Sequence, residues 1–415
     1  AAFGKRPVPD DLEVINARGK HLTSGIVDEH SHIAAVRGIN EGTQASSAEV
    51  SLQHVIDAED IDVYRQLAGG VTTSQILHGS ANPIGGQSAL IKLRWGASPL
   101  EMLVEDAPPF IKFALGENVK QSNWGDDQTV RFPQTRMGVE QVFYERFLAA
   151  AEYAEAWRAH NRAMTEWERR LFRRGDPPVA PRRDLELEVL GQILSGERHI
   201  TCHSYRQDEI NMLMHVADSL GFRINTFTHI LEGYKVADKL AEHGAAGSTF
   251  SDWWAYKYEV KDAIPYNGAV LHGQGVLTGF NSDDAEMARR LNQEAAKAMK
   301  YGGVPEEEAW KFVTLNPARM LHIEDRVGSI APGKDADLVL WNGPPMSIYT
   351  RAEQTWVDGR CEYSLEEDAQ LRAAIQAERA RLIQAMLADP SEDRQNPAFK
   401  PAFHYHCDTQ LEETR

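Results

Sequence analysis

The chain has 415 residues, a length that fits one large domain beside a smaller one, and its 42% hydrophobic content supplies a core. Its formal net charge of -17 disfavours nucleic acid and an anionic membrane surface as partners, and no apolar run is long enough to cross a bilayer. The three cysteines, Cys202, Cys361 and Cys407, are too few and too scattered for a disulfide framework or a cysteine-type zinc site.

The first 24 residues predict a short strand at 12–15 and a turn at Gly19. They carry no signal peptide, so the sequence leaves the location of the protein open. If the chain is cut from a longer precursor, both the cytoplasm and the periplasm remain open as its location.

Residues 25–32 predict a buried strand that ends in two histidines. Ile26 and Val27 are apolar and β-branched, as buried strands prefer. His30 and His32 are two residues apart, so both side chains leave an extended strand on one face. Such a pair can bind one divalent metal ion, although it is also common in strands that bind none.

Three more strands and a helical insertion are predicted before residue 195. The β-rich run 71–77 leads into a glycine-rich loop at 78–86, which is not a P-loop because no Gly-Lys-Ser/Thr follows. Residues 88–93 and 110–115 are further strand candidates. From about 139 to 195, charged helical segments with spaced aromatic residues predict a long insertion.

From residue 199 onward, short strands alternate with helices, a rhythm typical of βα units around a parallel sheet. Over the whole chain about eight strands are predicted, the number that closes a (β/α)8 barrel. The sequence therefore predicts an α/β protein built on a TIM-like barrel.

Near residue 327 the pattern changes to short strands, at 327–330, 336–341 and 355–360, which predict a small β domain beside the barrel. Ser364 and Glu367 have the spacing of a capping box for a helix that reaches about residue 388. That helix carries an apolar stripe, which we expect to dock on the rest of the protein. The stripe consists of Leu371, Ile375, Leu382 and Met386.

Five residues of the types that bind metals fall at the ends of four predicted barrel strands. In a parallel barrel, reactive residues lie at such ends. A single histidine on a strand is usually structural, but five such residues make coincidence a poor explanation. Neutral imidazoles with a carboxylate favour Zn²⁺ or a similar transition ion over Ca²⁺ or Mg²⁺. The five residues are His30, His32, His203, His229 and Asp283.

These segments resemble the amidohydrolase superfamily, and within it the imidazolonepropionase-like branch. Residues 24–32, SGIVDEHSH, look like the first-strand signature of that family. The segments 201–203 and 227–229 resemble its fifth- and sixth-strand histidines, and 280–283 resembles its eighth-strand aspartate. Residues 314–339 resemble the closing signature that leads into its β-sandwich.

The resemblance implies a metal-dependent hydrolase with one or two divalent ions. His30 and His32 would bind the buried ion, and His203 and His229 would bind a second ion where one is present. Asp283 would contact the metal and transfer the proton of an activated water, with His203 as a further catalytic candidate.

The fourth-strand ligand departs from a simple match. Lys112 resembles the lysine that is carbamylated in binuclear members, and Glu117 could instead supply a carboxylate directly. The sequence favours Lys112, because it lies inside the strand pattern, and keeps Glu117 as a rival.

Most of the N-terminal half of the β-sandwich is missing, so a second chain segment completes it or the chain is a fragment. We predict a sandwich remnant at 1–24, a barrel at 25–322, a second sandwich part at 323–363 and a helix with a tail at 364–415.

Asp283 and Asp284 are adjacent, and only one is expected to face the metal. Asp284 directly precedes a predicted helix and can serve as its N-cap, which leaves Asp283 as the catalytic candidate.

We expect hydrolysis of a C–N bond, amide or cyclic amide, in a small-molecule substrate. The alternatives are a deaminase or dipeptidase of the same superfamily, and a non-catalytic metal-binding domain of a larger protein. A homo-oligomer is a further expectation. Polar and aromatic residues on loops after strand ends are candidates to line the pocket: His78, Asn82, Tyr205, Arg206, Trp253, Trp254 and Tyr256.

Overall fold

A computed structural model of the chain describes residues 14–35, 39–120, 130–170, 175–251, 253 and 256–388. Residues 12 and 13 of the strand predicted at 12–15 lie outside these residues, and so do Trp254 and Cys407, whereas Val14 and Ile15 are described and are not in a strand. Among the helices of the described part, none combines the length and the apolar character that a membrane span requires.

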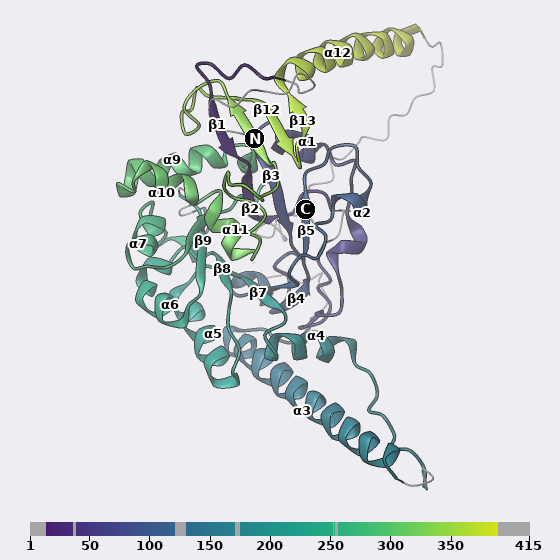
Figure 1. Cartoon of the computed structure of the whole chain (residues 1–415). Coiled ribbons are helices and arrows are strands. Elements are labelled where there is room, and N and C mark those ends of the chain that lie inside the picture. Colours follow the sequence, from purple (N-terminus) through teal and green to yellow (C-terminus); the bar gives the residue numbers. More distant parts are fainter. Residues whose placement is uncertain are drawn as a thin grey trace.

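The larger of two central sheets has six strands in the order β10-β9-β8-β7-β6-β4 (Figure 1). Its five parallel strands supply the ends at which site residues were predicted, whereas β4 runs antiparallel to β6. The strands are β4 Ile84–Gln87, β6 Phe110–Ala114, β7 His199–Ser204, β8 Thr226–His229, β9 Ala246–Thr249 and β10 Thr278–Phe280.

The second central sheet holds the first histidine strand. In it β2 (Ile26–Ser31) pairs in parallel with β3 (Val71–Ile76), and β5 (Ala89–Lys92) runs antiparallel to β3. The backbone N–H of Asp283, just past β10, donates to the carbonyl of His30 at 3.1 Å, so the two sheets meet at the predicted site.

The structure confirms an α/β fold and corrects the prediction that its central strands are all parallel. Between β3 and β6 the chain runs antiparallel through β4 and β5, and the strands form two sheets. Short apolar runs such as residues 88–93 carry no signal for strand direction, because parallel and antiparallel buried strands share the same residue types.

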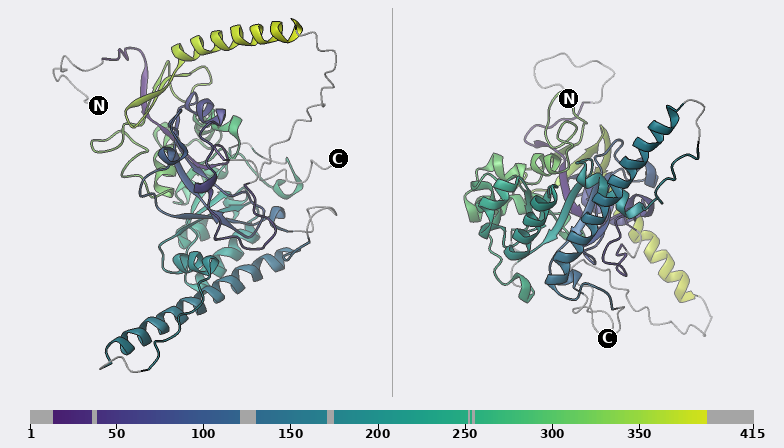
Figure 2. Two further views of the ribbon diagram at one scale, coloured as in Figure 1. Left: turned by 90° about the vertical axis from the view of Figure 1, so that its right-hand side faces the viewer. Right: turned by 90° about the horizontal axis from the view of Figure 1, so that it is seen from below.

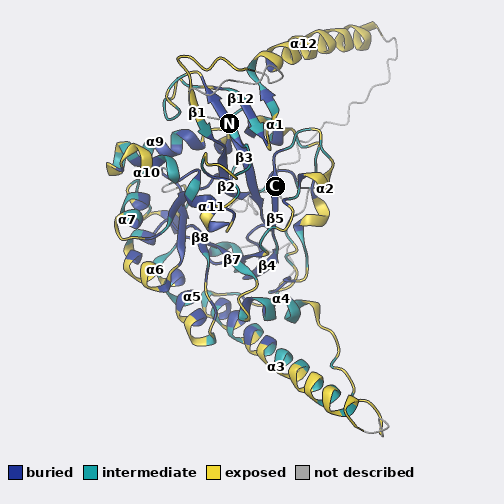
Figure 3. Cartoon of the chain, in the orientation of Figure 1, coloured by how far each residue is buried: buried dark blue, intermediate teal, exposed yellow. Residues whose placement is uncertain are grey.

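The helices lie outside the sheets, and most of them, α12 excepted, bury apolar faces against the core (Figure 3). Several are short, and α5, α6 and α9 end at a glycine in the left-handed conformation, as helix C-termini often do. They are α1 Ile61–Leu67, α2 Pro99–Met102, α3 Arg136–Glu168, α4 Leu185–Leu194, α5 Gln207–Leu220, α6 Ala237–His243, α7 Asn267–Gly273, α8 Ala285–Ala288, α9 Leu291–Gly302, α10 Glu306–Lys311, α11 Leu315–Met320 and α12 Leu365–Ala388.

The predicted helical insertion is present as α3 and α4, and α3 extends well beyond the sheets (Figure 2). Its first turns are buried, with Phe143 stacked on Phe113 at 5.5 Å and Phe147 on Phe222 at 4.1 Å between ring centroids. Farther out, the Trp167 indole N–H donates to the carbonyl of Gly175. The aromatic spacing thus marks the face that α3 buries.

The C-terminal β domain is one antiparallel sheet in the order β1-β11-β12-β13. It joins β1 (His21–Ser24) to β11 (Leu338–Trp341), β12 (Ala352–Val357) and β13 (Arg360–Ser364). No second sheet faces it among the described residues, so the predicted sandwich is not seen. The strand predicted at 327–330 is wrong, because Gly328, at φ +81°, turns the chain there.

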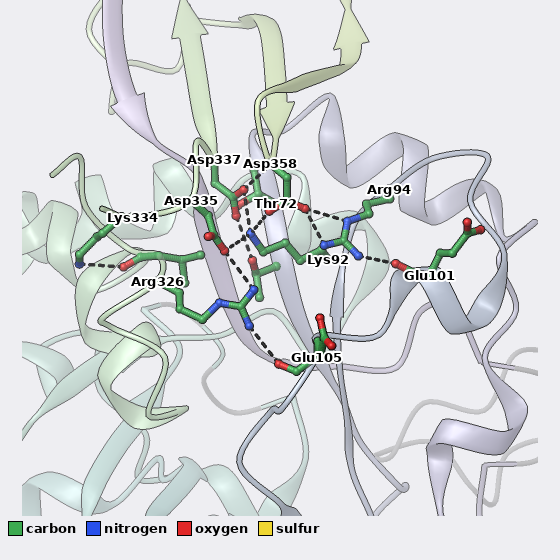
Figure 4. A network of polar contacts seen from close by, with 12 residues as sticks. Thr72, Lys92, Arg94, Glu101, Glu105, Arg326, Lys334, Asp335, Asp337 and Asp358 are labelled. Atoms are coloured by element: carbon green, nitrogen blue, oxygen red, sulfur yellow. Dashed lines mark hydrogen bonds and ion pairs between the residues drawn. The ribbon is translucent and has the colours of Figure 1, made fainter. Parts of the chain in front are cut away.

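A buried lysine connects this sheet to the central strands (Figure 4). Lys92, at the end of β5 and 1% exposed, places its ammonium 2.7 Å from Asp335, 3.0 Å from Asp337 and 2.5 Å from Asp358. Arg94 shares Asp358 at 2.6 Å. Burial alone would lower the pKa of Lys92, but the three carboxylates outweigh it and raise the pKa. This cluster therefore joins the C-terminal β domain to strand β5 of the central sheets.

Replacing Lys92 by methionine is expected to lower the free energy of unfolding by about 3–5 kcal/mol, since it leaves the buried carboxylate of Asp337 without its cation. Arg94→Met, at a partly exposed member of the same cluster, should cost about 1 kcal/mol or less. Urea denaturation of both variants measures the difference. Equal losses would show that burial of the ammonium does not set the cost.

The predicted docking of the α12 stripe is wrong. Leu371 is 44% exposed, Ile375 64%, Leu382 47% and Met386 61%, and Asp368 is the one buried residue of the helix. Figure 3 shows α12 standing away from the sheets with most of its surface exposed. Periodicity identified an apolar stripe, but it carries no information on what the stripe contacts.

Candidate metal centre

Three predicted ligands converge where β2 and β10 end. Nε2 of His30 lies 3.3 Å from Nε2 of His32, and each lies 3.1 Å from Oδ1 of Asp283. His30 and Asp283 are buried and His32 is partly buried. Nδ1 of His32 is 2.9 Å from the carbonyl oxygen of Leu77, which fixes the proton on Nδ1 and leaves the lone pair on Nε2. The atoms that converge are thus able to bind a metal.

Unusual backbone conformations place the site residues. His229, at φ 63°, and Asp283, at φ 52°, lie in the left-handed region, which non-glycine residues adopt rarely and at an energetic cost. Asp284 accepts hydrogen bonds from the N–H groups of Glu286 and Met287 and is the N-cap of α8. The prediction that Asp284 caps a helix is confirmed. The catalytic role predicted for Asp283 stays a prediction.

A buried carboxylate holds the loop that carries Asp283. Asp28 accepts hydrogen bonds from the Ser282 hydroxyl at 2.5 Å, the Ser282 N–H at 3.1 Å and the His30 N–H at 3.3 Å. Burial raises the pKa of Asp28 to about 7, although these hydrogen bonds act to lower it. Because the pair joins β2 to the loop after β10, it fixes His30 and Asp283 relative to each other.

Ser282→Ala is therefore expected to lower metal affinity or turnover by about 10- to 100-fold, as the loss of a supporting hydrogen bond to a ligand loop commonly does. Ser80→Ala is the matched control, because Ser80 is also fully buried and its hydroxyl has no partner among the described residues. Metal titration and initial rates measure both variants. Equal effects would show that the loss reflects packing and not the link to Asp28.

His203 and His229 complete a cluster of imidazoles at the ends of β7 and β8. Their ring centroids are 4.6 Å apart, and that of His229 is 4.7 Å from that of His30. Both side chains are fully buried, and neither nitrogen of His203 has a hydrogen-bond partner within the described chain. Buried polar atoms without partners are costly unless a ligand binds them, so the donor set fits one or two divalent ions.

The electrostatics of the cluster suit metal ligands. Burial holds the pKa of His203 well below its ordinary value and lowers that of His229 to about 3, so both imidazoles are neutral and keep a free lone pair. Burial alone would raise the pKa of Asp283, but the facing His229 and His30 outweigh it and hold the pKa well below the usual range. Asp283 is thus a carboxylate.

Lys112 and Glu117 are separated by the fold. Lys112, inside β6, is fully buried, and its Nζ lies 3.1 Å from Nε2 of His30. Glu117 lies beyond the strand and lines a different pocket of about 350 Å³, together with Arg206 and Glu259. The geometry therefore brings Lys112 to the three converging residues. It leaves Glu117 in this second pocket, which we call the rim pocket.

His78 and Asn82 support the neighbouring loop. The His78 Nδ1 is 2.7 Å from the carbonyl of Gly79, and its Nε2 accepts the N–H of Glu41 at 2.8 Å. The Asn82 amide N–H groups bond to the carbonyls of Glu41 and Gln44. With both ring nitrogens used by the backbone, His78 offers neither to a substrate, whereas Oδ1 of Asn82 has no partner among the described residues.

Aromatic rings form one wall of the centre. Tyr205 stands edge-on to His203 at 4.5 Å, and Phe250 stacks on His229 at 4.9 Å. Trp253 stacks on Phe250 at 4.2 Å. Tyr256 donates its hydroxyl to that of Tyr205 at 3.2 Å. The wall limits access to the two histidines from this side.

Arg206 does not join the wall. It pairs with Asp208, with both carboxylate oxygens within 3.0 Å, and lines the rim pocket together with Glu117. Trp254 lies outside the described residues.

Sequence reasoning missed Asp28, Phe250 and Lys257. The Lys257 ammonium lies 4.2 Å from the centre of the Tyr205 ring and contributes to the lowered pKa of His203. Asp28 could have been found from its position two residues before His30 on the same strand face. Lys257 lies in an irregular loop without a periodic signal, and only the folded chain brings it to the site.

Comparison with known proteins shows the family of the chain. A family model described as amidohydrolase family matches residues 204–370. Amidohydrolase tasK of Hapsidospora irregularis is 32% identical over 383 residues, and the match covers 86% of this chain and 38% of that protein. Guanine deaminase of Escherichia coli (strain K12) is 23% identical over 374 residues, covering 81% of this chain and 76% of that enzyme.

A solved structure agrees with the sequence matches. The crystal structure of an amidohydrolase from Thermotoga maritima MSB8 is 32% identical and superposes with a TM-score of 0.76, covering 88% of this chain and 92% of that one. The chain matches less than half the length of tasK but almost all of the Thermotoga protein. With its histidines and aspartate gathered at strand ends, the chain belongs to the amidohydrolase family.

Proposed function

We propose that this protein hydrolyses a C–N bond, amide or cyclic amide, in a small-molecule substrate, with Zn²⁺ as its metal. The observation that carries the proposal is the convergence of His30, His32 and Asp283 beside Lys112 and two further buried histidines. We also propose that the two central sheets together form the barrel of the imidazolonepropionase-like branch, a (β/α)8 barrel in which β4 and β5 are antiparallel departures, with the centre at its mouth.

The metal would be held by His30, His32 and Asp283, with Lys112 beside His30 as a further candidate ligand, and a second ion would be held by His203 and His229. A divalent ion bound there supplies a water of lowered pKa and a Lewis acid for the substrate carbonyl. An ion held by His203 would satisfy one of its two ring nitrogens, both of which are buried without partners among the described residues.

Asp283 transfers the proton in this proposal. Its carboxylate is ionised, so it accepts the proton of the attacking water and later delivers it to the leaving nitrogen. His203, neutral and fully buried, donates from its ring N–H to the carbonyl oxygen as charge develops there. The aromatic wall of Tyr205, Phe250 and Trp253 excludes water from one side of the reacting bond.

Metal content and a substrate panel test the proposal together. The purified chain should contain one or two zinc ions, and it should hydrolyse at least one member of a panel of N-acyl amino acids, dipeptides and cyclic amides. Chelation should abolish turnover and added Zn²⁺ should restore it. A chain that binds no transition metal would favour a non-catalytic domain and refute the hydrolase.

The same assay separates hydrolysis of amides from deamination. Guanine deaminase is among the relatives, so aminopurines belong in the panel, with release of ammonia as the readout. If the chain released ammonia from an aminopurine and cleaved no amide, its proposed activity would change from amide hydrolysis to deamination. Cleavage of dipeptides alone would narrow the activity to a dipeptidase.

A further inference from the structure

A positive charge lies on the wall beside His203, and the proposed hydrolysis assigns it no role. The ammonium of Lys257 is 4.2 Å from the centre of the Tyr205 ring, and that ring stands edge-on to His203 at 4.5 Å between centroids. The Lys257 side chain is 20% exposed, so its charge is only partly hydrated. Burial is the main cause of the lowered pKa of His203 and of His229, and the charge of Lys257 adds to it at both rings.

Contacts on the side of the rim pocket hold Lys257 in place. Its Nζ donates to Oδ1 of Asn118 at 3.4 Å and lies 3.9 Å from Oε2 of Glu259. Glu259 is buried, pairs with Arg136 at 2.6 Å and accepts the backbone N–H of Glu117 at 3.0 Å. The carboxylate of Glu259 is thus beyond hydrogen-bond distance of Lys257 and is shared with a nearer cation, so it offsets the lysine charge only in part.

This cation changes the field that an incoming substrate meets. The chain carries a net charge of -17, so an anionic molecule approaches it against repulsion. The imidazoles of His203 and His229 are neutral, so Lys257 makes this side of the centre positive. An anionic group of the substrate is therefore stabilised at the wall, whereas a cationic group is repelled from it.

We propose that the substrate is an N-acyl amino acid whose carboxylate is bound by the Lys257 ammonium, an assignment that rests on the proposed amide hydrolysis. In such a substrate one residue, which spans at most about 3.6 Å, separates the scissile bond from the carboxylate. A hydrogen bond from His203 to the carbonyl and a charge-assisted hydrogen bond of about 2.8 Å from Lys257 occupy the two ends. Together these lengths match a path that crosses only the ring of Tyr205 between the two side chains.

Lys257 also separates the candidate substrates from one another. An ammonium has three N–H donors on a rotatable head and binds a carboxylate as a point charge. An unsubstituted cyclic amide and an aminopurine carry no carboxylate, so neither gains from this contact. N-acyl amino acids are therefore expected to be the best substrates of the panel.

Paired substrates that differ only in the charged group test the assignment. N-acetylglycine, N-acetyl-L-alanine and N-acetyl-L-leucine are each compared with the corresponding carboxamide, with release of acetate as the readout. The free acids should have kcat/KM values about 10- to 100-fold above those of the carboxamides, as expected for a hydrogen bond to a charged group. Equal values, or higher values for the carboxamides, would overturn the proposal.

Lys257→Met should raise KM for the free acids by about 10- to 100-fold and change kcat by about threefold or less, because it removes binding that ground state and transition state share. The carboxamides should be unaffected, and Lys257→Arg, which keeps the charge, should recover most of the loss. Lys261→Met is the matched control, since the Lys261 ammonium also lies over a tyrosine ring, 4.9 Å from the centre of Tyr258, but in the rim pocket. An equal loss for acids and carboxamides in Lys257→Met would show a structural role and overturn the proposal.

Binding of levulinate tests the carboxylate site without any turnover. Levulinate is N-acetylglycine with the amide nitrogen replaced by carbon, so it keeps the carbonyl and the carboxylate but has no C–N bond to cleave. Calorimetric titration of the chain as purified should show tighter binding of levulinate than of levulinamide. Lys257→Met should remove this difference, and Lys261→Met should keep it.

The two assays separate failure of the carboxylate site from failure of the hydrolase. A chain that prefers levulinate through Lys257 but cleaves no amide would refute the hydrolysis and support the carboxylate site. A chain that cleaves amides but binds levulinate and levulinamide equally would refute the carboxylate site alone.

Discussion

Asp283→Asn is expected to lower kcat by about 10³-fold or more while the protein keeps at least one metal ion per chain. The asparagine has the same shape and can still offer a carbonyl oxygen beside His30 and His32, 3.1 Å away in the unmodified chain. It cannot accept the proton of the attacking water. Metal analysis and steady-state kinetics of the same preparation separate the two effects.

Asp284→Asn is the matched control for this variant. Asp284 lies next to Asp283, but its carboxylate accepts the N–H groups of Glu286 and Met287 as the N-cap of α8. Asparagine caps helices about as well as aspartate, so both stability and turnover should stay close to those of the unmodified protein. If Asp283→Asn, loaded with metal, kept turnover within tenfold of normal, Asp283 would not be the proton carrier.

Lys112→Met is expected to lower turnover by about 10²- to 10³-fold and to reduce the metal bound at saturation. Methionine fills the same buried space in β6 but cannot reach His30 as a polar group. In the unmodified chain the lysine Nζ lies 3.1 Å from that ring. The number of zinc ions per chain, measured on the same preparations as the rates, shows whether the loss of turnover accompanies the loss of a second ion.

Glu117→Gln serves as the comparison for Lys112, because both residues are candidates for the same ligand position. Glu117 lines the rim pocket beside Arg206, so its substitution should change turnover by about threefold or less. The opposite pattern, with a severe loss for Glu117→Gln and a small one for Lys112→Met, would assign the fourth-strand ligand to Glu117.

Predictions from the sequence were most accurate where the signal is local. His30 and His32 share one strand face because the side-chain period of a strand is two residues, and the structure brings their Nε2 atoms to 3.3 Å. The division between Asp283 and Asp284 follows from the cap that the next helix requires. The same reasoning placed a long helix near 139, observed as α3.

Errors arose where the answer depends on residues far apart in the chain. Residues 88–93 form a strand, yet only pairing with β3 shows that β5 runs antiparallel. The α12 stripe was expected to dock, but nothing in its periodicity identifies a surface that contacts it. His78 stays a prediction as a pocket residue, but its Nε2 accepts the N–H of Glu41, a contact that its own sequence neighbourhood does not reveal.

The sequence by itself determined the residue types of the candidate site, their order along the chain and the strand ends on which they lie, because those properties depend on residue type and on the short periods of strands and helices. Only the tertiary structure decided that Lys112, and not Glu117, lies beside His30, and that Asp28 and Ser282 hold the loop of Asp283. The physical reason is that these contacts join strands far apart in sequence, and side-chain packing sets which of them form.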